Sequence, residues 1–107
     1  MATATDRWLT DSIATAVPGS NILQVRHVAS RSKGNSFYAL VSVTTAFTGS
    51  VQVEVSPPGA GTWALIGTAM TAPGGQSIQI PADCDLRFNA TALSAGGPIS
   101  CFLELPA

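Results

Sequence analysis

From residue 21 onward, apolar and polar residues alternate in short runs that are separated by clusters of Gly, Pro and Ser. This period of two is the spacing of β-strands, whose successive side chains point to opposite faces of a sheet. No helical pattern lies between the runs to supply the crossovers of a parallel sheet. The pattern therefore predicts an all-β, antiparallel β-sandwich of the Ig-like or jelly-roll-like kind. The predicted strands are residues 22–29, 37–47, 51–55, 63–67, 77–80, 85–92 and 99–105.

The last two runs show the clearest alternation. In each of them the apolar residues share one face: Cys84, Leu86, Phe88, Ala90 and Ala92 in the first, and Ile99, Cys101, Leu103 and Leu105 in the second. The two runs are predicted to pair as a hairpin with these faces turned to the core. Phe102 is the exception, because it is an aromatic residue on the polar face. Single exposed apolar side chains are common, and the alternative is that Phe102 contacts another subunit.

A second hairpin is predicted between the runs 37–47 and 51–55. A three-residue connection, Thr48-Gly49-Ser50, places Val43 opposite Val55 and keeps the valines of both runs on one face. A two-residue connection would turn them to opposite faces, because a slip of one residue exchanges the two sides of a strand. The hydrophobic pattern therefore predicts an odd-numbered loop or a bulge.

The segment SPPGAG, which begins at Ser56, predicts the end of a strand. Two consecutive prolines cannot donate hydrogen bonds to a neighbouring strand, and Pro-Gly favours a tight turn. Trp63 starts the next run, where its indole is predicted to pack on the core. The alternative for Trp63 is a stacking role at the surface.

The first twenty residues have a different pattern. Trp8, Leu9, Ile13 and Val17 recur at roughly helical spacing, and Pro18-Gly19 would end a helix there. An extended arm that becomes ordered only against a neighbour is the alternative. The predicted organisation is thus residues 1–20 as an N-terminal arm or short helix and residues 21–107 as the β-sandwich domain.

Composition adds that much of the surface is suited to contact with other chains. The 107 residues are enough for one domain, but only 10% of them are charged and the net charge is -1. Soluble domains have roughly 25% charged residues, and a weakly charged surface gives little repulsion between neighbours. Neither a secretory signal nor a membrane-spanning run is recognisable, so the chain is expected to start in a reducing cytosol. Cys84 and Cys101 are then predicted to be buried free thiols, with a single disulfide as the alternative.

The sequence offers little for catalysis, and no enzyme activity or cofactor is expected. His27 is the only histidine and has no nearby carboxylate to orient it. Asp83 and Asp85 flank Cys84 and are predicted to point the same way. This arrangement fits a solvated strand entrance, an acid/base pair or part of a calcium site. Of these the solvated entrance is the favoured interpretation. No metal site is predicted.

Basic residues gather in the segment RHVASRSKGN. Arg26, Arg31 and Lys33 hold three of the five Lys and Arg residues of the chain. A plain solvated loop and a contact with the acidic edge of another copy explain this cluster about equally well. Nucleic acid is the weaker alternative, because three charges make a small phosphate footprint.

Two segments resemble small β-sandwich structural proteins of tailed bacteriophages. The first is GSVQVEVSPPGAGTWALIG, in which a strand ends in a V-S-P-x-G turn and leads to a tryptophan; the second is GGQSIQIPADCDLRFNATALSAGGPISCFLEL. The resemblance covers roughly residues 43–105. Its matching positions are Val55, Ser56, Pro57, Gly59 and Trp63, followed by Ile80, Pro81, Ala82, Leu86 and Arg87.

This resemblance implies a virion protein without enzymatic activity, assembled in the host cytoplasm. Its most concrete form is a capsid decoration or cement protein that bridges major capsid subunits as a homo-oligomer, with a trimer expected. Partner-binding residues are predicted at Trp8, Arg26, Arg31, Lys33 and Phe102. The alternatives are a head–tail adaptor, tail or fibre module, and a carbohydrate-binding module that uses Trp63 and Tyr38 as a stacking platform.

Overall fold

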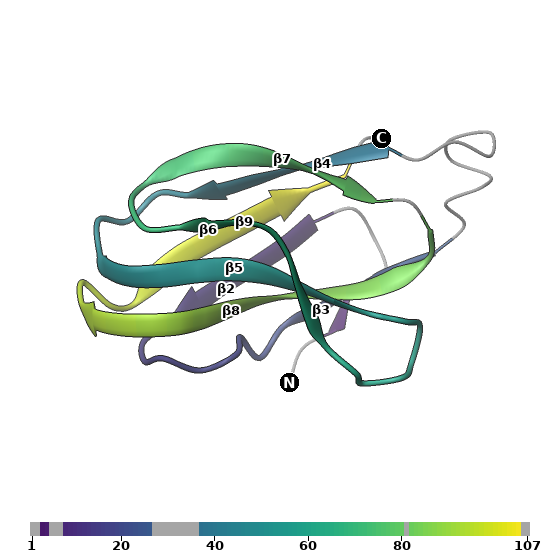
Figure 1. Ribbon diagram of the computed structural model, residues 1–107, viewed down its shortest axis with the longest axis horizontal. Helices are drawn as coiled ribbons and strands as arrows, with labels where there is room; N and C mark the ends of the chain where they lie inside the picture. The colour runs from purple at the N-terminus through teal and green to yellow at the C-terminus, as the bar shows by residue number, and fades with distance from the viewer. Residues whose placement is uncertain (1–2, 5–7, 27–36, 81, 106–107) are drawn as a thin grey trace.

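The computed structural model describes residues 3–4, 8–26, 37–80 and 82–105, and these residues form two β-sheets packed face to face (Figure 1). Sheet A has the strand order β1-β3-β8-β5-β6, and sheet B has the order β2-β9-β4-β7. All pairings are antiparallel except that of β1 with β3, so the predicted all-β antiparallel sandwich is confirmed. The strands are β1 Thr3–Ala4, β2 Trp8–Ile13, β3 Ile22–Val25, β4 Phe37–Val43, β5 Thr48–Ser56, β6 Ala64–Met70, β7 Gly74–Ile80, β8 Cys84–Ala95 and β9 Ile99–Glu104.

The prediction of an N-terminal helix is wrong. Residues Trp8–Ile13 form β2, which pairs along its whole length with β9. Leu9 and Ile13 are buried in the core, and Asp11 lies between them on the same side of the strand. A spacing of four residues fits both a helical turn and a period of two, so the pattern did not separate the alternatives. The sandwich therefore begins before residue 21, and its N-terminal strand is ordered by its own chain. Among the described residues no helix has the length and hydropathy that crossing a membrane requires.

Both predicted hairpins are wrong as well, although the faces of their strands are right except at Ala92, which is exposed beyond a shift in the register of β8 with β5. β8 lies in sheet A between β3 and β5, whereas β9 lies in sheet B between β2 and β4. In the same way β4 belongs to sheet B and β5 to sheet A, so each connection crosses from one sheet to the other (Figure 1). The valines of β5 do face the core, but they pair with β8, as in Val53 opposite Phe88. Alternation identifies the buried face of a strand but does not identify the strand with which it pairs.

The core lies between the sheets and takes large apolar side chains from both. Leu86 and Phe88 contribute from β8, and Val41 and Leu103 contribute from sheet B; each is at most 1% exposed. Removing such apolar surface from water is the main favourable term in folding. The period-two pattern of the sequence is thus converted into one continuous interior, with the alternate side chains left on the two outer faces.

The SPPGAG segment ends β5 at Ser56, as predicted, and continues in a turn in which the amide of Ala60 donates to the carbonyl of Pro57 at 3.0 Å. The prediction that Trp63 packs in the core is wrong. Its ring is half-buried on the outer face of sheet A, with the guanidinium carbon of Arg87 4.2 Å from the ring centroid. A cation stacked on an aromatic ring is favourable when partly shielded from water, which explains this position.

Candidate functional site

The outer face of sheet A is closed by interactions within the chain. Glu54 and Arg87 lie opposite each other on β5 and β8 and form an ion pair of 2.8 Å. Arg26 and Asp85 form a second ion pair of 2.8 Å. Glu54 is only 8% exposed and Asp85 only 6%, so Asp85 is not the solvated residue that the sequence predicts. Buried charges need such partners, because an unpaired one carries a large desolvation cost.

The turn after β5 covers the same face. The amide of Gly59 donates to Asp85 Oδ2 at 3.0 Å, and the amide of Thr62 donates to Ser56 Oγ at 3.1 Å. Together with Trp63 on Arg87, these bonds hold residues 57–63 against sheet A. The turn therefore bonds the side chains of Asp85 and Ser56 within the molecule.

Of the predicted basic cluster Arg26, Arg31 and Lys33, the structure describes only Arg26. Arg26 donates to the carbonyls of Val25 and Cys84, both at 3.0 Å, as well as to Asp85. It is therefore engaged within the molecule. His27, Arg31 and Lys33 lie outside the described residues. Their predicted roles stay predictions.

The outer face of sheet B is different, because large apolar side chains gather on it. Trp8 is 46% exposed, Tyr38 60% and Leu40 53%, and Phe102 is half-buried. The strand register places Trp8 and Leu40 on either side of Glu104, and Phe102 between Thr10 and Ser42. We call the group Trp8, Tyr38, Leu40 and Phe102 the sheet B face. The structure thus brings together two predicted partner residues that are 94 positions apart (102 − 8).

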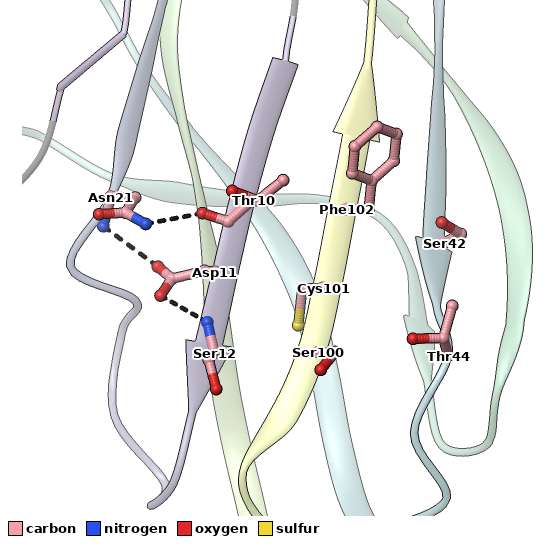
Figure 2. Close-up of a pocket in the computed structure, with 9 residues that line it drawn as sticks. All are labelled: Thr10, Asp11, Ser12, Asn21, Ser42, Thr44, Ser100, Cys101 and Phe102. Carbon is pink, nitrogen blue, oxygen red and sulfur yellow. Dashed lines mark hydrogen bonds between the residues drawn. The ribbon is translucent and has the colours of Figure 1, made fainter.

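A groove of about 650 Å³ adjoins the sheet B face. Figure 2 shows hydroxyl side chains on β2, β9 and β4 around the ring of Phe102. The groove is lined by Thr10, Asp11, Ser12, Asn21, Ser42, Thr44, Ser100, Cys101 and Phe102. Asp11 accepts hydrogen bonds from the amides of Ser12 at 2.8 Å and Asn21 at 3.1 Å. Its carboxylate thereby fixes the chain that leads from β2 to β3.

A second cleft, of about 500 Å³, opens between β6 and β7 and is mainly apolar. Its lining residues are Val55, Ser56, Pro57, Pro58, Ala64, Ile66, Gln79, Ile80, Ala82, Asp83 and Cys84. Each concavity has one cysteine and one aspartate in its lining, Cys101 with Asp11 in the first and Cys84 with Asp83 in the second. In the described part of the chain, no three His, Cys, Asp or Glu side chains are placed to hold a metal ion.

Both cysteines are free and buried, as the sequence predicts. Burial raises the pKa of Cys84 to about 11, and the Asp85 carboxylate adds to this shift. Burial also raises the pKa of Cys101 to about 12, with a further contribution from Asp11. A raised pKa lowers the fraction of thiolate at any pH below it, and the thiolate is the reactive form. Both thiols are therefore expected to react slowly near neutral pH.

This inertness is directly testable. At about pH 8, iodoacetamide is expected to leave both thiols unmodified in the folded protein and to modify both in denaturant, because unfolding restores ordinary pKa values and access. Mass spectrometry of the intact chain measures the number of adducts. Rapid modification of either cysteine before unfolding would contradict the burial described for it.

No protein-family model matches the chain, and no curated protein matches its sequence. The positions of the side chains in the structure therefore define the candidate site. Sequence reasoning found Trp8 and Phe102, gave Tyr38 only as part of a stacking platform with Trp63, and missed Leu40; Tyr38 and Leu40 alternate with the buried Ala39 and Val41 along β4. That parity was visible in the sequence. The platform of Trp63 and Tyr38 does not exist, because Trp63 lies on sheet A and Tyr38 lies on sheet B.

Proposed function

We propose that this chain is a non-enzymatic structural protein of a tailed-bacteriophage virion, in its most concrete form a capsid decoration or cement protein. The resemblance of residues 43–105 supports the class of protein. The observation that carries the proposal is the exposed, apolar and weakly charged sheet B face, set against an outer face of sheet A that is closed by its own ion pairs. The proposed partner is the major capsid protein, and the place of assembly is the host cytoplasm.

The chemistry of the sheet B face suits a permanent protein contact. Trp and Tyr are enriched at the centres of interfaces, where burial of a large ring contributes much of the binding energy. Each copy has a small contact area, so many copies acting together supply the strength of attachment by avidity. A symmetric homo-oligomer, for which we propose a trimer, multiplies the contacts of each particle further. The rigid sandwich then spans the seam between neighbouring capsid subunits.

Leu40 tests this contact, and Leu65 supplies a matched control. Both are strand leucines of similar exposure, 53% and 48%, but Leu65 lies opposite Glu54 on the outer face of sheet A. Replacing Leu40 with Ser is expected to weaken binding to capsid shells that lack the protein by about tenfold, which corresponds to about 1.4 kcal/mol. Leu65→Ser is expected to bind as the wild type does. Cosedimentation of shells with labelled protein measures both affinities.

The outcomes separate the alternatives. Equal binding by the two variants would show that the sheet B face is not the contact. Attachment of the wild type to tails or fibres alone would replace the capsid role by the tail or head–tail alternative. Retarded migration in gels that contain neutral polysaccharide, without binding to virion parts, would favour a carbohydrate-binding module. The groove beside Phe102, with its hydroxyl side chains, is the observation that keeps this second candidate open.

A further inference from the structure

Among the described strands, those at the ends of each sheet have a neighbour on one side only. In sheet A these edge strands are β1 and β6, and in sheet B they are β2 and β7. The free backbone N–H and C=O groups of an edge strand form a template to which another extended chain can add. The side chains that cover the edge strands therefore affect how copies of the chain associate.

The edge of β6 is occupied by a side chain from the other sheet. Gln76, on β7, reaches Thr68 on β6: the amide of Thr68 donates to Gln76 Oε1 at 3.0 Å, and Gln76 Nε2 donates to the carbonyl of Thr68 at 2.6 Å. A carboxamide offers one acceptor and one donor side, as a peptide group does. The Gln76 carboxamide thus bonds both the N–H and the C=O of Thr68, the two groups to which an added strand would bond.

A close approach of the two sheets makes this bond possible. Gly67, next to Thr68, has a φ of 73°, and a side chain at that position would lie 2.8 Å from Ile78 Cγ2. The register between β5 and β6 also shifts between Val51 and Val53, and Gln52 Nε2 donates to the carbonyl of Gly67 at 3.0 Å. Bulges of this kind interrupt the regular edge of a strand, which makes it a poorer template for pairing.

The edge of β2 is treated in the same way. Asn21 Nδ2 donates to the carbonyl of Thr10 at 2.7 Å, and the amide of Ser12 donates to Asp11 Oδ1 at 2.8 Å (Figure 2). Asn21 is held in place because its own amide donates to Asp11 Oδ2 at 3.1 Å. Side chains therefore bond the carbonyl of Thr10 and the amide of Ser12, which are alternate residues of β2. A further chain could pair there only by displacing them.

We propose that Gln76, with Asn21 and Asp11, closes the edges β6 and β2 to strand addition by other copies of this chain. Of the other two edges, β1 offers only two residues for pairing. The bonds of Gln76 lie at the exposed surface, where a single hydrogen bond adds little to stability. Control of pairing is the function that the position of this side chain explains. The inference does not depend on the proposed function.

Replacing Gln76 with Leu removes both bonds at similar side-chain volume. Gln24→Leu makes the same substitution at a half-buried position on β3 of sheet A, away from the sheet B face and from the edge of β6, and is the matched control. Gln76→Leu is expected to associate at about a tenfold lower concentration than the wild type, with a rise in thioflavin T fluorescence, because an edge with free bonding groups pairs readily. Gln24→Leu is expected to behave as the wild type. Analytical ultracentrifugation over a concentration series measures the onset.

A folded Gln76→Leu variant that associates no earlier than Gln24→Leu would overturn the proposal. If Gln76→Leu does not fold, hydrogen exchange of the wild type decides instead. The amide of Thr68 is then expected to exchange about a hundredfold more slowly than an open amide, because the carboxamide protects it. Exchange at the rate of an open amide would show that the edge is not closed. Association of Gln76→Leu without any binding to virions would uphold this inference while the virion role failed.

Discussion

Replacing Phe88 with Ala is expected to lower the free energy of unfolding by about 3–5 kcal/mol. Phe88 is fully buried in β8 and faces Val53 of β5, so its removal leaves a cavity between the sheets that surrounding strands cannot collapse to fill. Domains of this size are stable by about 5–15 kcal/mol, so the loss is a large fraction of the total. Urea denaturation followed by circular dichroism measures it.

Phe102→Ala is the control, because it deletes the same atoms from the outer face of sheet B. Phe102 alternates with the buried Cys101 and Leu103, and we expect its removal to cost about 1 kcal/mol or less, since a partly exposed ring buries less apolar area. The difference between the two variants tests the assignment of inner and outer faces. Equal costs would mean that β8 and β9 do not present their side chains as described.

Gly96→Ala is expected to have the second large effect, on the connection between β8 and β9. Gly96 has a φ of 91°, and a methyl group there would lie 2.5 Å from the carbonyl oxygen of Ala46 and from Phe47 Cα. Backbone strain of about 1–3 kcal/mol is then added to an overpacking cost of similar size. The melting temperature and the free energy of unfolding should both fall.

Gly59→Ala separates the two contributions. Gly59 has a similar φ of 70°, but no atom lies within 4 Å of the position that a methyl group would take. Its replacement should cost only the conformational strain, about 1–2 kcal/mol. If both glycine variants lose the same stability, then residues 46–47 do not pack against the turn at Gly96, and the crossing between the sheets is described wrongly.

Much of the fold follows from side-chain alternation, and what does not follow depends on pairing between distant strands. The buried faces of β8 and β9 are correct because each apolar residue fixes the side of its own strand. Assignment of β8 to sheet A and β9 to sheet B depends on Val53 meeting Phe88 and Leu9 meeting Leu103, and no local signal carries such contacts. The sequence of β2 also fits a short helix, because its two buried residues, Leu9 and Ile13, are four positions apart.

The candidate site, like the fold, can be predicted from the sequence only in part. Trp8 and Phe102 stand out in the sequence as aromatic residues in polar surroundings, and Leu40 was recoverable from the parity of β4. The pairing of Arg26 with Asp85 and the stacking of Arg87 on Trp63 were not recoverable. Both bring together side chains from strands or turns that only the register of sheet A places side by side. Sequence reasoning therefore found part of the open face and missed how the other face is closed.

The positions of the two tryptophans give the molecule a pair of built-in optical probes. Trp8 lies on the exterior of one layer beside Glu104, and Trp63 lies on the exterior of the opposite layer against a guanidinium. An indole's emission depends on its immediate surroundings, so a partner that covers one side changes one signal and leaves the other as it was. Spectra of single-tryptophan forms can thus report which side of the molecule is occupied, without any attached dye.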